Sequence, residues 1–137
     1  MKKIEDVCVL VSARLNSHRV PKKMTRDFAG QTLVDICLKK LLKSKVIPKK
    51  NIVFSAYEKE LKEIAGKYSI EIFNRSEASA NSEGDDLTVL YDWHNKIDFK
   101  YVMMVNPCLP FLETETIDNF FINYLESECD GMFGVIE

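Results

Sequence analysis

The sequence predicts an α/β fold, a Rossmann-like three-layer sandwich in which a mostly parallel sheet lies between two layers of helices. Short apolar runs rich in β-branched residues alternate along the chain with segments whose apolar residues recur at helical spacing. Strands and helices that alternate in this way are joined by right-handed crossovers, which set the strands parallel. The 137 residues suffice for one hydrophobic core, and no linker or repeat interrupts them, so we expect one domain over residues 1–137.

Five strands are expected at the apolar runs. The first, residues 7–13, is a nearly continuous apolar run that is typical of a strand buried on both faces. The others are expected at residues 51–56, 69–73, 101–106 and 131–136. Open α/β sheets bind their ligands at the edge where the carboxyl ends of the strands meet, so the segments after these strands are the candidate site.

Four helices are expected between and after these strands, at residues 32–43, 58–67, 85–95 and 115–126. An apolar stripe at helical spacing supports the first of them, formed by Leu33, Ile36, Cys37, Leu41 and Leu42. The longest irregular segment is residues 74–84, directly after the third strand. We expect this segment to form a second wall of the site.

The segment after the first strand is unusually basic. Four cations lie within ten residues, at Arg14, Arg19, Lys22 and Lys23, with only small, polar or turn-forming residues around most of them. Cations this close repel one another unless an anion relieves them. The segment is poorly suited to a core and well suited to a polyphosphate, so the sequence predicts a nucleotide site here.

The net charge of −2 conceals an asymmetry between the two parts of the chain. Residues 1–50 hold 13 Lys or Arg against 4 Asp or Glu, and residues 51–137 hold 6 against 17. Lys39, Lys40 and Lys43 on the first helix are expected to form a solvated face. Because the chain as a whole is acidic and carries no recognised nucleic-acid module, a small phosphate ligand fits better than nucleic acid.

Several classes of protein are not favoured. No apolar run approaches the roughly 20 residues that span a bilayer, and no secretory signal precedes the first strand, so we expect a cytoplasmic protein without a membrane partner. The four cysteines, at positions 8, 37, 108 and 129, are expected to be small buried side chains without disulfides. Neither they nor the two histidines show metal-ligand spacing, and His18 is expected to have no catalytic role.

One motif in the basic segment points to a family. Arg-x-x-Ser-x-Arg-x-Pro-x-Lys, which the chain carries from Arg14 to Lys23, resembles the opening motif of the cytidylyltransferases that activate acidic sugars. That family includes the CMP-sialic acid and CMP-Kdo synthetases and related polysaccharide-biosynthesis nucleotidyltransferases. The residues 28–33 that follow are similar to the family's lead-in to the first helix.

The resemblance implies a fold, a reaction and a cofactor. The fold would be of the nucleotide-diphospho-sugar transferase type. The reaction would transfer CMP from CTP to an acidic sugar, sialic acid-like or Kdo-like, with release of pyrophosphate, in the synthesis of surface polysaccharides or glycans. Mg²⁺ would be the cofactor.

The resemblance also assigns roles in the basic segment. Arg14 and Lys23 would grip the phosphates and are the expected catalytic residues, since guanidinium groups suit phosphate oxygens. Ala13, Asn16 and Ser17 would surround the nucleotide with backbone and side-chain donors. Two readings of Arg19 stay open: it contacts phosphate, or it pairs with a carboxylate and braces the loop. Lys22 is expected to face solvent.

The segment 74–86 resembles the family's stretch after the third strand. By this likeness Arg75, Asn81 and Ser82 would contact the base or the ribose. The residues alone also allow a simpler interpretation, a helix amino terminus capped by Ser82 or Gly84, with the two aspartates that follow in its first turn.

The segment after the fourth strand is similar to the family's Q-P-T-S-P-L signature. Asn106 stands at the glutamine position and would hold the sugar or the ribose, while Pro107 and Pro110 fix the turn. Cys108 stands where Kdo-type members place a metal-binding aspartate. A thiol is a poor Mg²⁺ ligand, so no metal ligand is assigned in this chain.

The resemblance covers nearly all of the chain but only about the first three-fifths of a typical family member. We therefore expect the family's C-terminal acceptor and dimerisation part to be absent here, while the family's dimers make a homodimer a reasonable expectation. Two alternatives remain: a nucleotidyltransferase with a different acceptor, and a truncated non-catalytic chain that binds nucleotide or a partner protein. A dehydrogenase is not favoured, because no Gly-x-Gly-x-x-Gly follows the first strand.

Overall fold

A single parallel sheet forms the middle of the molecule. The computed structural model describes residues 1–135. The strands are β1 (Val7–Ser12), β2 (Ile52–Ala56), β3 (Glu71–Asn74) and β4 (Tyr101–Val105). Their order is β3-β2-β1-β4, and each neighbouring pair is parallel. This order places the first strand inside the sheet, so its apolar run is covered from every side.

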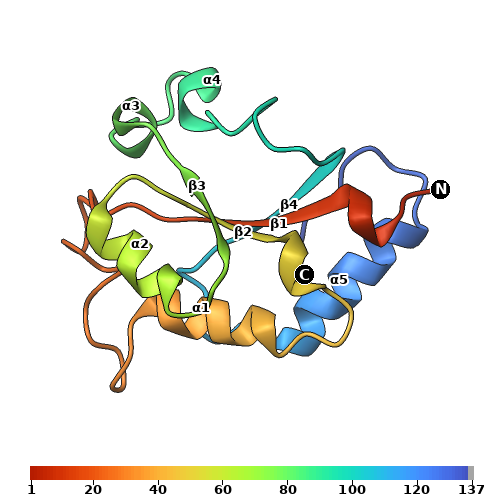
Figure 1. The fold of residues 1–137 in the computed structure, drawn as a ribbon, viewed down its shortest axis with the longest axis horizontal. Coiled ribbons are helices and arrows are strands. Elements are labelled where there is room, and N and C mark those ends of the chain that lie inside the picture. The colour runs from red at the N-terminus through yellow and green to blue at the C-terminus, as the bar shows by residue number, and fades with distance from the viewer. Residues whose placement is uncertain (136–137) are drawn as a thin grey trace.

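Helices cover both faces of the sheet, which confirms the three-layer α/β fold. The longer helices α1 (Leu33–Leu42), α2 (Lys59–Gly66) and α5 (Thr114–Glu126) lie below the sheet in Figure 1. The short helices α3 (Glu77–Ala80) and α4 (Leu87–Leu90) lie above it. Two 3₁₀ turns, η1 (Ile4–Asp6) and η2 (Lys49–Asn51), precede β1 and β2.

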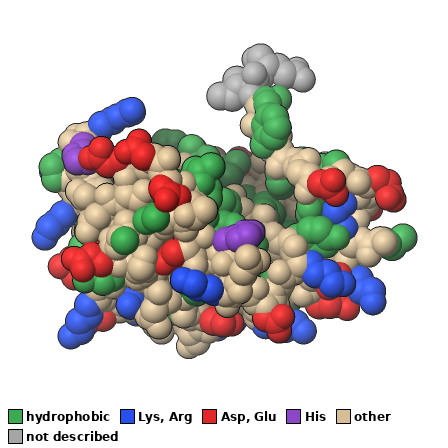
Figure 2. Space-filling view, turned by 90° about the horizontal axis from the view of Figure 1, so that it is seen from above, with side chains coloured by type: hydrophobic (Ala, Val, Ile, Leu, Met, Phe, Trp, Pro, Cys, Tyr) green, Lys and Arg blue, Asp and Glu red, His purple; other side chains and the backbone are tan. Residues whose placement is uncertain are grey.

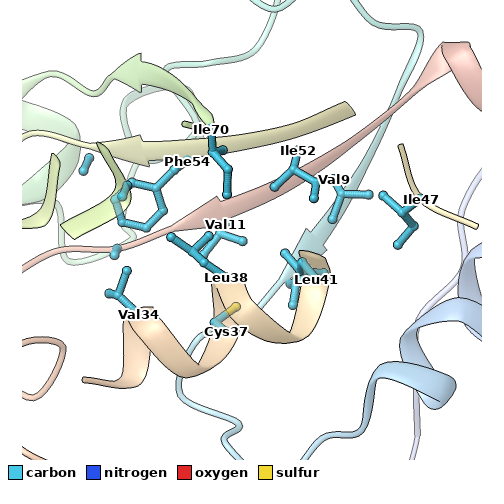
Figure 3. Packing of buried hydrophobic residues seen from close by; sticks show 14 of the residues in the cluster. Val9, Val11, Val34, Cys37, Leu38, Leu41, Ile47, Ile52, Phe54 and Ile70 are labelled. Atoms are coloured by element: carbon cyan, nitrogen blue, oxygen red, sulfur yellow. The ribbon is translucent and has the colours of Figure 1, made fainter. Parts of the chain in front are cut away.

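The alternation of side chains along β1 explains the core on both faces. Val7, Val9 and Val11 are fully buried in the main cluster, which includes Leu38 and Leu41 of α1. Figure 3 shows strand side chains directed at this helix. The intervening Cys8 and Leu10 point to the other face, where they meet Trp93, Ile97 and Phe99. One strand therefore anchors two apolar layers, as the period of a strand requires.

A capping box begins α1. The hydroxyl of Thr32 accepts from the backbone N–H of Asp35 at 3.0 Å, and the Asp35 carboxylate accepts from the backbone N–H of Thr32 at 3.1 Å. The Tyr68 hydroxyl also donates to Asp35, which ties the end of α2 to the start of α1. Although partial burial raises the pKa of Asp35, the hydrogen bonds from Tyr68 and Thr32 outweigh it and lower that pKa.

Two expected elements differ from the structure. The helix expected at residues 85–95 is only the single turn of α4, because Asp86 caps it and the backbone leaves helical angles at Tyr91. The residues after it instead turn so that Trp93 packs on the sheet. The capping interpretation was wrong in its residue, since Asp86 rather than Ser82 or Gly84 accepts from the first turn, through the Thr88 N–H.

The strand expected at residues 131–136 does not form in the part that the structure describes. Residues 131–135 are irregular, with Phe133 and Val135 largely exposed, and Ile136 lies outside the described residues. In the described sheet β4 pairs with β1 alone, and no ladder joins residues 131–135 to it. An apolar segment with β-propensity forms a strand only where a neighbouring strand pairs with it, and residues 131–135 have none in the described sheet. The segment 74–84, expected to be irregular, contains α3.

No helix in the described residues is both long and apolar enough to cross a bilayer.

We expect the Asp35→Asn variant to be about 1 kcal/mol less stable than the parent at neutral pH, since it weakens the cap of α1. The pKa of Asp35 is lowered in the folded chain, so its contribution is present above the unfolded pKa of about 3.9 and is lost as the pH falls through the lower folded value. Urea unfolding across pH 7 to 3 measures the difference, which should shrink at the acidic end.

Thr116→Ala serves as the control, because Thr116 is exposed on α5. Its stability relative to the parent should not depend on pH in this range. A gap between Asp35→Asn and the parent that stays constant down to pH 3 would contradict the assignment.

Candidate active site

A cavity of about 410 Å³ opens at the carboxyl ends of the central strands. The loop after β1, which lies at the left of Figure 1, supplies most of its wall. The volume falls within the usual range for small-molecule sites. Its lining comprises Ser12, Ala13, Arg14, Asn16, Ser17, His18, Arg19, Lys23, Met24, Arg75, Leu90, Tyr91, Met104 and Cys108.

The start of the loop is held against the end of β2. The Ala13 N–H donates to the carbonyl of Ser55 at 3.1 Å, which extends the pairing of β1 and β2 by one bond. The Leu15 N–H then donates to the Glu58 carboxylate at 3.0 Å. These two bonds set the direction in which the chain leaves the sheet, so Arg14 emerges beside the cavity from a fixed backbone.

Arg75 is the most constrained cation of the cavity. Its side chain is 6% exposed, and it donates through Nε to the Ser79 hydroxyl at 2.8 Å, through Nη2 to the Ser79 carbonyl at 3.0 Å and through Nη1 to the Ala13 carbonyl at 3.2 Å. The Ser79 hydroxyl in turn donates to the Leu90 carbonyl at 2.8 Å. One guanidinium therefore joins the loop after β1, the α3 turn and, through Ser79, the end of α4.

The acceptors of Arg75 are all neutral oxygens. The guanidinium makes no ion pair within the described part of the chain. Burial lowers the pKa of Arg75, and the neighbouring charge of Arg14 lowers it further, while Asp92 and Glu58 act in the opposite direction. Two guanidinium groups thus lie near one another in the wall of the cavity with their charge only partly compensated.

Two contacts connect the loop after β1 with the loop between α3 and α4. The Arg14 Nη1 donates to the Ser82 carbonyl at 2.5 Å. The His18 ring lies 3.6 Å from the Glu83 carboxylate, in an exposed position. Figure 2, which views the molecule from the side of α3 and α4, shows acidic and basic side chains and a histidine gathered at its left end. The two loops therefore lie side by side at the mouth of the cavity.

The structure brings most of the predicted site residues together. Six of them lie in the cavity wall on the first loop, and Arg75 joins them from the end of β3; the six are Ala13, Arg14, Asn16, Ser17, Arg19 and Lys23. Arg19 makes no ion pair with a carboxylate in the described residues, so the structure does not support the reading in which it braces the loop. Lys22 is exposed and lies outside the lining, as expected.

Three predicted residues lie outside the lining of this cavity. Asn81 is exposed on the loop after α3, and Ser82 contributes its carbonyl to Arg14 rather than a wall. Asn106 is exposed, and its side-chain oxygen accepts from the Cys108 N–H at 2.9 Å, so it closes a turn of its own backbone. Their roles in binding remain predictions.

Several lining residues escaped the sequence analysis. They are Ser12, Met24, Leu90, Tyr91 and Met104; Cys108 and His18, which were discussed without a role in binding, also line the cavity. Met104 lies opposite Leu10 in the register of β1 and β4, near the carboxyl end of its strand, so strand position could have found it. Leu90 and Tyr91 could not be found in this way, since their place depends on where α4 stops.

The cysteines divide into two groups. Cys8 and Cys37 are buried as expected, and burial raises the pKa of each to about 12. The same expectation was wrong for Cys129, which is exposed, because it lies on the irregular segment after α5, while Cys108 is half-buried in the cavity wall. All four are free thiols.

The residues of the cavity do not fit a magnesium ion. Its lining, given above, contains no carboxylate, and the described residues hold no cluster of His, Cys, Asp and Glu that could bind a metal. Mg²⁺ prefers hard, usually anionic oxygens, and the thiol of Cys108 stands where the family resemblance places a metal-binding aspartate. We derive no step through a metal from these residues.

A second cavity, of about 370 Å³, lies away from this edge. It includes Tyr101 and Val102 at the amino end of β4, together with Trp93 and Tyr124. Ligands of open α/β sheets bind at the carboxyl ends of strands, so the first cavity is the candidate active site.

We expect Ser79→Ala to lower the free energy of unfolding by about 1–3 kcal/mol, because it leaves the buried Nε of Arg75 and the Leu90 carbonyl without their partner. Ser82→Ala is the matched control, since its hydroxyl bonds only the exposed Gly84 N–H. It should change stability by less than about 0.5 kcal/mol. Urea unfolding measures both, and equal values for the two serines would refute the role of Ser79.

Sequence comparison relates the chain to one family over almost all of its length. The family model described as Cytidylyltransferase matches residues 8–134. Among curated proteins, the CMP-N,N'-diacetyllegionaminic acid synthase of Legionella pneumophila is 29% identical over 117 residues. That match covers 81% of this chain and 50% of the relative, so the chain spans about half the length of the curated relative.

Solved structures share the fold. A CMP:2-keto-3-deoxy-manno-octonic acid synthetase complexed with CTP has a TM-score of 0.65 at 12% identity, covering 85% of this chain and 46% of that one. A cytidylyltransferase from Leptospira borgpetersenii serovar Hardjo-bovis has a TM-score of 0.71 at 21% identity, covering 90% and 50%. At these identities the likeness establishes the fold.

The resemblance that rested on the loop after β1 is confirmed by the family match from β1 to the end of the described residues, and the chain belongs to the cytidylyltransferase family.

Proposed function

We propose that this chain is the nucleotide-binding part of an enzyme that transfers CMP from CTP to an acidic sugar and releases pyrophosphate. The observation that carries the proposal is the cavity at the carboxyl edge, whose wall holds Arg14, Arg19, Lys23 and Arg75 and no carboxylate. Family membership supports CTP as the donor. The Legionella relative, named as a synthase of a CMP-linked acid, supports the class of acceptor.

The proposed reaction is an in-line displacement at the α-phosphorus of CTP. A hydroxyl oxygen of the sugar forms the new bond to phosphorus as the bond to the bridging oxygen breaks. The electron pair of that bond leaves with pyrophosphate, and the hydroxyl proton passes to solvent. Charge grows on the leaving group, so groups that stabilise negative charge there accelerate the step.

The residues of the loop divide this work. Arg14 and Lys23 stabilise the phosphates and are the proposed catalytic residues, while Arg19 adds a third cation at the rim. Asn16, Ser17 and the backbone around Ala13 offer hydrogen-bond donors where the chain passes the nucleotide. The carbonyl that now accepts from Arg14 belongs to Ser82, so Arg14 can exchange this acceptor for a phosphate oxygen.

The wall opposite the loop is proposed to hold the nucleoside. Arg75 is fixed by three hydrogen bonds, and its remaining N–H groups are available to a carbonyl of the base. Asn81 and Ser82 would lie near the ribose, and Asn106 would contact the ribose or the sugar after its turn opens. The role of Arg75 rests on the family resemblance and on its place in the cavity wall, and the roles of Asn81, Ser82 and Asn106 rest on the family resemblance.

The proposed cellular role, partners and cofactor follow from the family resemblance. The chain would act in the cytoplasm in the synthesis of surface polysaccharides, together with a further part that, on the family resemblance, would hold the acceptor and form a homodimer. Mg²⁺ is proposed as the cofactor of the complete reaction on the family resemblance. Nucleic acid and membranes are not proposed as partners.

We expect CTP to stabilise the folded chain more than UTP, ATP or GTP do. A ligand at about 100 times its dissociation constant adds roughly 2.7 kcal/mol to the free energy of unfolding, which a thermal melt resolves. Arg14→Ala and Lys23→Ala should each weaken the binding of CTP by about tenfold or more, because each removes a charge-assisted contact.

The matched controls are Arg26→Ala and Lys22→Ala, which remove exposed cations outside the cavity. Both should bind CTP as the parent does. Equal stabilisation by all four nucleotides would overturn the choice of CTP. Binding of CTP without release of pyrophosphate, when an acidic sugar is supplied, would favour the non-catalytic alternative for this chain.

A further inference from the structure

We propose that this cavity binds the nucleoside triphosphate in its metal-free form and that magnesium weakens this binding. The inference rests on the proposed function and deepens it, since it names the ionic form of the ligand. It starts from the disagreement between the expected cofactor and the residues that line the cavity.

The side chains that line the cavity give its wall a positive charge. Arg14, Arg19, Lys23 and Arg75 all line the cavity, and the lining includes no acidic side chain. Asp92 and Glu58, whose charges act on Arg75, lie outside the lining and have other contacts: Asp92 accepts from the Ser76 N–H and Glu58 from the Leu15 N–H, while Glu83 pairs with His18. The wall therefore presents a concentrated positive charge to whatever enters.

Neutral oxygen atoms hold the two arginines in the wall. Arg75 is only 6% exposed, and its acceptors are two backbone carbonyls and a serine hydroxyl. Arg14 likewise donates to a carbonyl. Neutral acceptors fix the guanidinium groups in place, and Asp92 and Glu58 offset the charge of Arg75 only in part. Two like charges held together in this way favour a highly charged anion between or beside them.

A magnesium ion would compete with these cations for the triphosphate. It would bind the non-bridging oxygens that the guanidinium and ammonium groups would otherwise bind, and it would neutralise half of the negative charge of the triphosphate. The cavity gives the ion no carboxylate in return, and its Cys108 thiol is a soft ligand. The metal complex thus loses contacts with the wall and gains none from the described residues.

Isothermal titration tests this with CTP and with inorganic tripolyphosphate, each in buffer containing EDTA and in buffer containing excess Mg²⁺ at equal ionic strength. Because exposed charge pairs contribute modestly, we expect the dissociation constant of either probe to be about tenfold higher with magnesium. Lys23→Ala should reduce this ratio several-fold, whereas Lys22→Ala should leave it as in the parent.

The outcomes separate this inference from the proposed function. Tighter binding of CTP with magnesium, or no difference between the buffers, overturns the inference and leaves the proposed function standing. Equal stabilisation by all four nucleotides in the thermal melt, together with the expected magnesium effect in the titration, supports the inference and overturns the choice of CTP. No binding of CTP or tripolyphosphate in either buffer overturns both.

Discussion

The shape of the cavity depends on one buried guanidinium. Arg75 joins the end of β1, the α3 turn and, through Ser79, the end of α4, segments that are far apart in the sequence. A charge that is 6% exposed normally requires an ionic partner, because burial without one is unfavourable. Here three hydrogen bonds to neutral oxygens satisfy three of the five N–H donors, and Asp92 and Glu58 offset the charge only in part, so the group that shapes the wall also makes it positive.

The sheet and the first loop could be predicted because their signals are local. The apolar run of β1 and the motif from Arg14 to Lys23 follow one another directly, and a parallel strand delivers the next residues to the carboxyl edge. The helix expected at residues 32–43 was also a local signal, since its apolar stripe lies within ten residues, although its capping box at Thr32 was not predicted. Such features need no knowledge of distant packing, so the sequence located the fold and most of the cationic wall.

The second wall could not be predicted in the same way, because it depends on tertiary contacts. Asp86 and Tyr91 limit α4 to one turn, and the chain after it packs Trp93 on the sheet instead of continuing a helix. Leu90 and Tyr91 reach the cavity as a consequence. The segment 131–135 shows the converse, since its apolar residues have strand propensity but remain irregular where no neighbouring strand pairs with them.

The acidic part of the chain contributes no acidic side chain to the lining of the cavity. Residues 51–137 hold 17 acidic side chains, yet what they contribute to the cavity is one arginine, a tyrosine, a thiol and two aliphatic side chains. The acceptors that this part of the chain offers are the carbonyl of Ser82 for Arg14, and the carbonyl and hydroxyl of Ser79 for Arg75. A carboxylate at any of these positions would hold the cations equally well and would neutralise them. Neutral acceptors keep the attraction for phosphate, which is the property that a triphosphate site requires.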